Sequence, residues 1–74
     1  MPRACEIAID IIVKCLDEEG IMVNTPSVEF QVNDWYNHTD IADPLLLATC
    51  VLNWGSYRLV NYNDIVMMSK AFFG

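Results

Sequence analysis

Basic residues are scarce in this 74-residue sequence, which has four Lys and Arg against ten Asp and Glu. Neither Lys nor Arg occurs between Lys14 and Arg58. The carboxylates in that interval are Asp17, Glu18, Glu19, Glu29, Asp34, Asp40 and Asp43. Because nucleic-acid binding depends on Lys and Arg displacing counterions, we expect no direct contact with DNA or RNA. Such an acidic surface instead attracts a basic protein. The alternative is that the acids only keep an apolar chain in solution.

Residues that hold metals or phosphate groups are also few, with three Cys, one His and three isolated Gly. Zinc sites need Cys and His pairs at short spacing, and calcium loops and phosphate loops need patterns that this chain lacks. His38 lies between Asp34 and Asp40, which would suit a base oriented by a carboxylate. No Ser, Cys or Lys lies close in sequence to serve as its nucleophile. The sequence therefore predicts no metal, no cofactor and no enzymatic activity.

Secretion and membrane signals are missing as well. Asp10 interrupts the first apolar run, no small-residue cleavage site follows it, and no run approaches the ~20 residues that span a bilayer. Cys5 and Cys15 lie ten residues apart on one predicted helix, about 15 Å along its axis, which is too far for a disulfide. We expect a cytoplasmic protein with reduced, buried cysteines and no membrane contact.

Hydrophobic residues make up 54% of the chain, which fits a packed core in one compact domain over residues 1–74. Polar residues recur every three or four positions between 4 and 19, which predicts a helix ended by Gly20. Asp43 as the N-cap and Pro44 at the first position predict a second helix over residues 45–54.

Between these helices, residues 21–23 read as a short strand. Val28, Phe30 and Val32 alternate with polar residues, as in a half-buried strand. In a competing helical interpretation, Thr25 caps the helix, Pro26 follows it, and one face carries the apolar residues Val28, Val32, Trp35 and Tyr36. Phe30 falls off that face, and Val and Asn are poor helix formers, so we predict the hairpin.

Residues 33–43 then form a polar loop, residues 57–60 a third strand, and Asn63 or Asp64 caps a last helix that runs through Phe73. The order α-β-β-α-β-α predicts an α+β domain with a short, mostly antiparallel sheet packed on helices. If residues 26–37 are helical instead, the alternative is an all-α fold.

The acidic, aromatic segment around residues 34–38 is the strongest candidate for a binding site, because large aromatics anchor interfaces and carboxylates select a basic partner. The alternative is that Trp35 fills the core, and Tyr36 would then be the more exposed of the two. The predicted partner-binding residues are Glu29, Asp34, Trp35, Tyr36, His38, Asp40 and Asp43. Near the end of the chain, Phe73 and Met67 could join a patch for self-association, which would give a homodimer.

The small size, the base-free stretch from Cys15 to Tyr57 and the lack of catalytic motifs together resemble the small acidic inhibitors that phages encode, such as anti-CRISPR proteins. The resemblance implies a cytoplasmic protein of the host cell that mimics DNA or blocks a nucleic-acid channel in a basic protein complex. It assigns no role to individual residues. A second hypothesis, from the excess of Ile, Leu, Met and Phe, is a structural or regulatory subunit held in an oligomer by its apolar surface.

Overall fold

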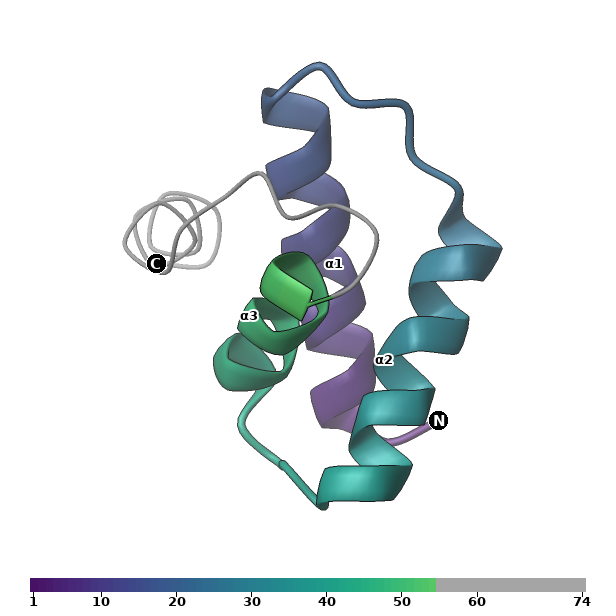
Figure 1. Ribbon diagram of the computed structural model, residues 1–74, viewed down its shortest axis with the longest axis vertical. Helices are drawn as coiled ribbons and strands as arrows, with labels where there is room; N and C mark the ends of the chain where they lie inside the picture. The colour runs from purple at the N-terminus through teal and green to yellow at the C-terminus, as the bar shows by residue number, and fades with distance from the viewer. Residues whose placement is uncertain (55–74) are drawn as a thin grey trace.

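The computed structural model describes residues 1–54, and this part of the chain folds into three α-helices (Figure 1). The helices are α1 (Arg3–Glu18), α2 (Thr25–Thr39) and α3 (Pro44–Trp54). α1 and α2 run in opposite directions side by side, and α3 packs against both of them. No helix in the described part is long and apolar enough to cross a bilayer.

One apolar core lies where the three helices meet. Its buried residues are Cys5, Ala8, Ile11, Ile12, Cys15, Leu16, Val28, Val32, Leu47, Ala48, Val51 and Leu52. α1 and α3 supply most of them, whereas α2 buries only two valines completely. The fully buried part of the core therefore comes mostly from α1 and α3.

The first helix agrees with the sequence prediction: α1 ends at Glu18, and the predicted glycine, Gly20, directly follows its cap residue. Gly20 has a positive φ of 73° and its N–H donates to the carbonyl of Asp17, at 3.0 Å. The N–H of Ile21 donates to the carbonyl of Leu16, at 2.9 Å. This pair of bonds is the Schellman arrangement, in which a left-handed residue satisfies the last carbonyls of a helix.

The predicted hairpin over residues 21–33 is wrong, because residues 21–24 form an irregular connection and α2 begins at Thr25. The cap is Asn24 rather than Thr25: its side-chain oxygen accepts a hydrogen bond from the N–H of Ser27, at 3.2 Å. Pro26 then stands in the first turn, where its missing N–H costs nothing. The predicted loop over residues 33–43 is also wrong in its first part, since α2 continues to Thr39.

The physical reason is that Val28 and Val32 fit both the two-residue repeat of a strand and the 3.6-residue repeat of a helix. Neighbouring residues therefore decide between the two structures. A strand would bury Phe30, whereas a helix turns Trp35 and Tyr36 toward the same side as the two valines. In the structure both aromatic residues pack against the core and Phe30 does not. Poor helix formers cost at most about 0.7 kcal/mol each, and the partial burial of two aromatic side chains on one helix face acts against that cost.

The start of α3 is confirmed. Asp43 Oδ1 accepts hydrogen bonds from the N–H groups of Leu45, at 2.9 Å, and Leu46, at 3.3 Å. Pro44 occupies the first helical position. The connection between α2 and α3 is therefore only residues 40–43.

The α+β fold class is wrong for this protein. Residues 1–54 contain helices and no strand, so the all-helical alternative describes them. The predicted strand at 57–60, the last helix and the patch of Met67 and Phe73 lie outside the described residues.

Candidate partner-binding surface

The seven predicted partner-binding residues lie on α2 and on the connection that follows it. The α2 residues are Glu29, Asp34, Trp35, Tyr36 and His38, and the connection holds Asp40 and Asp43. The structure divides them into two groups. The charged residues and His38 are exposed, whereas the two aromatic residues are half-buried.

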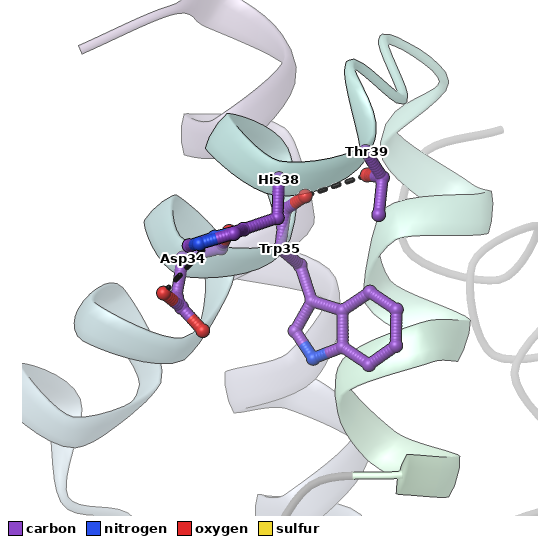
Figure 2. Close-up of polar contacts among 4 residues, drawn as sticks. All are labelled: Asp34, Trp35, His38 and Thr39. Atoms are coloured by element: carbon purple, nitrogen blue, oxygen red, sulfur yellow. Dashed lines mark hydrogen bonds and ion pairs between the residues drawn. The ribbon is translucent and has the colours of Figure 1, made fainter.

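Trp35 and Tyr36 both pack against the apolar core. The expectation that Tyr36 is the more exposed of the two depended on an extended backbone, in which neighbouring side chains point to opposite faces. On a helix they lie about 100° apart, so both can reach one wide face. Figure 2 shows the indole ring of Trp35 directed away from the contact between Asp34 and His38. Both aromatics therefore hold α2 on the core.

Asp34 and His38 form a contact across one turn of α2 (Figure 2). The Nδ1 atom of His38 lies 2.8 Å from the backbone carbonyl oxygen of Asp34 and 3.3 Å from its carboxylate Oδ1. A carbonyl only accepts, so Nδ1 carries a hydrogen and donates it. In the neutral ring Nε2 is then an acceptor that can meet a donor from a partner.

The end of α2 bends the chain toward α3 through an uncommon backbone conformation. Asp40 has φ 56° and ψ 22°, in the left-handed region, and its N–H donates to the carbonyl of Tyr36, at 2.9 Å. The Thr39 hydroxyl donates to the carbonyl of Trp35 and accepts from the N–H of Ile41, at 3.4 Å. Asp tolerates the left-handed region better than most residues. This geometry leaves the Asp40 carboxylate in solvent.

Electrostatically, α2 and the connection after it carry carboxylates, and neither Lys nor Arg occurs on α2, on α3 or on the connection between them. The cations of the described residues, Arg3 and Lys14, both lie on α1, where Arg3 Nη1 contacts Glu6 Oε2 at 3.2 Å. We call Asp34, Asp40 and Asp43 the acidic segment. All three side chains are exposed, in the C-terminal half of α2 and the connection after it.

Sequence reasoning missed Phe30, which it assigned to the interior of a strand. The structure places it on α2 with 72% of its surface exposed. In the helical interpretation Phe30 falls off the apolar face, and this was the sequence signal for its exposure. An aromatic residue on a polar helix face is a candidate for contact with another molecule.

The three thiols offer no reactive group to this surface. Cys5, Cys15 and Cys50 are free and buried. Burial raises the pKa of each thiol, and the Glu19 carboxylate raises the pKa of Cys15 further. Within residues 1–54, no group of three His, Cys, Asp or Glu side chains is placed to hold a metal ion.

Comparison with known proteins identifies no relative. No family model matches the sequence. No curated protein and no solved structure is significantly similar to it. The function is therefore inferred from the residues of this surface.

Proposed function

We propose that this protein acts by binding a larger, basic protein that handles nucleic acid, and that it inhibits that protein by mimicking DNA or blocking its channel. The observation that supports the proposal best is the acidic segment. Asp34, Asp40 and Asp43 are exposed, and no Lys or Arg lies on α2, α3 or their connection to neutralise them. A DNA-binding channel lined by Lys and Arg is complementary to such a surface.

Binding rather than catalysis is part of this proposal, and so is a location in the cytoplasm, which would be that of the host cell if a phage encodes the protein. The resemblance to anti-CRISPR proteins supports both.

The test is capture of partners by the tagged full-length protein and by variants that remove the charge of the acidic segment. The substitutions are chosen to keep the backbone conformation. Asp43→Asn keeps the cap of α3, and Asp40→Asn keeps a residue that tolerates the left-handed region. We expect the variant D34N/D40N/D43N to lose a basic, nucleic-acid-binding partner that the natural protein retains at low salt. Raised salt or excess duplex DNA should release the same partner.

The matched control is D17N/E18Q/E19Q, which removes the same charge at the C-terminal end of α1. That end lies opposite the α2–α3 connection in Figure 1. The control should keep the partner, since its acids lie at the far end of the molecule. Retention of the partner by D34N/D40N/D43N, or binding indifferent to both salt and DNA, would contradict the proposal.

A second candidate function is a subunit held in an oligomer by apolar contacts. It is favoured by the exposure of Met22, Phe30 and Leu46. These residues lie on the α1–α2 connection, α2 and α3 rather than on one element. Sedimentation at millimolar concentration tests the homo-oligomeric form of this candidate, because a strict monomer would rule that form out while a subunit of a mixed oligomer would survive.

A further inference from the structure

The face of α2 that points away from the core carries a narrow stripe along the helix. Its residues are Pro26, Phe30, Asn33 and Asn37, which we call the outer stripe. They are separated by four, three and four positions, so they share one side of the helix. This is the spacing of the a and d positions by which one helix packs against another. Asn33 is half-buried and the others are exposed.

Acids flank this stripe on both sides. With Phe30 at an a position, Glu29 takes the preceding g position and Asp34 the following e position. Both carboxylates are exposed, and α2 contains neither Lys nor Arg. Residues at e and g determine which helix pairs with which through their charges. This stripe therefore repels a second acidic copy of itself and attracts a helix with Lys or Arg at its own flanking positions.

Several polar side chains of α2 already donate to groups of the same helix. Asn33 Nδ2 donates to the carbonyl of Glu29, at 3.0 Å, and His38 Nδ1 donates to the carbonyl of Asp34, at 2.8 Å. Gln31 Nε2 donates to the Ser27 hydroxyl, at 3.2 Å. Burying a donor without a partner costs about 1–3 kcal/mol. Because one N–H of Asn33 and the Nδ1 of His38 already have acceptors within α2, another helix can cover these two groups at lower cost.

Phe30 supplies the apolar contact. Its ring is 72% exposed. A single aromatic side chain can carry much of the energy of an interface when the residues around it exclude water.

From these observations we propose that the outer stripe of α2 docks a basic amphipathic helix of a partner protein, with Phe30 inserted between its apolar side chains and Glu29 and Asp34 paired with its Lys or Arg. This inference rests on the proposed function and names the contact through which the partner is held. The Asn residues in the seam keep the pairing weaker than an all-apolar coiled coil but define its register.

The test uses a synthetic helical peptide with a leucine seam flanked by lysines as the probe. Titration of the full-length, isotope-labelled protein should shift NMR signals of the outer stripe and its flanking acids. Phe30→Ser should weaken peptide affinity by about tenfold or more. The matched control is Met22→Ser, which removes a side chain that is 93% exposed outside α2 and should leave the affinity unchanged.

Charge is tested separately. E29Q/D34N should weaken binding several-fold and reduce its salt dependence, and a peptide with glutamate in place of lysine should not bind. No binding of the lysine peptide at millimolar concentration would overturn the inference, as would signal shifts confined to α1. If Phe30→Ser instead abolishes self-association of the free protein, the stripe is a homodimer interface and the inference is wrong.

The two proposals fail in distinguishable ways. If Phe30→Ser binds the peptide normally while E29Q/D34N does not, the docking geometry is wrong and acid-dependent partner binding stands. If D34N/D40N/D43N still captures its cellular partner while Phe30→Ser loses the peptide, the helix docks as inferred but the acidic segment does not select the partner. Circular dichroism shows whether each variant remains folded.

Discussion

The Nδ1 atom of His38 lies 2.8 Å from the backbone carbonyl oxygen of Asp34, one turn earlier in α2. The contact determines which nitrogen keeps the hydrogen when the ring is neutral, because a carbonyl needs a donor. We expect the neutral ring to be the Nδ1–H tautomer. Long-range proton–nitrogen NMR at alkaline pH shows which ring nitrogen of His38 carries the hydrogen. The urea-unfolded chain serves as the reference. A folded protein with the hydrogen on Nε2 would contradict the contact.

Val32 and Phe30 distinguish the helix from the predicted strand by their effects on stability. Val32→Ala should lower the free energy of unfolding by about 2 kcal/mol, because Val32 is fully buried. Phe30→Ser should change it by less than about 0.5 kcal/mol, because its ring contacts solvent. A hairpin with an inward Phe30 would give two large losses. Urea unfolding monitored by circular dichroism measures both values.

Asp40 is sensitive to side-chain shape because of its left-handed backbone. Asp40→Val should destabilise the protein by about 1–2 kcal/mol, since a β-branched side chain clashes with the backbone at positive φ. Asp40→Asn is the control and should be close to neutral. Equal melting temperatures for the two variants would show that the turn relaxes without cost.

The side chains that cap α2 and α3 should each contribute to stability. Asn24→Ala and Asp43→Ala should each cost about 1 kcal/mol, because each removes the acceptor for N–H groups at a helix start. Asp43→Asn should retain most of the stability, since its amide oxygen can still accept. Thermal unfolding of the three variants tests this, and a loss in Asp43→Asn equal to that in Asp43→Ala would assign the effect to charge instead.

Because the thiols are buried, we expect the free energy of unfolding to fall at alkaline pH. The folded state raises the pKa of Cys15 above the ordinary value of 9.0, mainly by burial and further by Glu19. As pH rises through about 9, the unfolded chain therefore releases this proton while the folded chain keeps it, and the free energy of unfolding falls. Below that pH the thiol is neutral in both states and has no effect on the pH dependence.

Cys15→Ala tests this prediction by comparison of slopes. The variant should be less stable at pH 7, because it leaves a small cavity, but its stability should fall less steeply between pH 8 and pH 10. Denaturant titrations at each pH give the two slopes. Parallel slopes in the natural protein and the variant would assign the alkaline loss to other groups.

Local signals in the sequence were sufficient for α1 and α3. Gly20 occupies a left-handed position, and Asp43 with Pro44 starts a helix, whatever the rest of the chain does. The lack of Lys and Arg between Lys14 and Arg58 likewise makes the acidity of α2 and its connection a property of the sequence alone. These features depend on residues a few positions apart.

The state of residues 25–39 was decided by tertiary structure, because Val28 and Val32 satisfy both the strand period and the helix period. Only packing on α1 and α3 selects the arrangement that buries part of Trp35 and Tyr36 and leaves Phe30 in solvent. The exposure of each predicted site residue follows from that choice. The sequence by itself determined the end of α1, the cap of α3 and the charge, whereas the contacts between helices decided which side chains of α2 face outward.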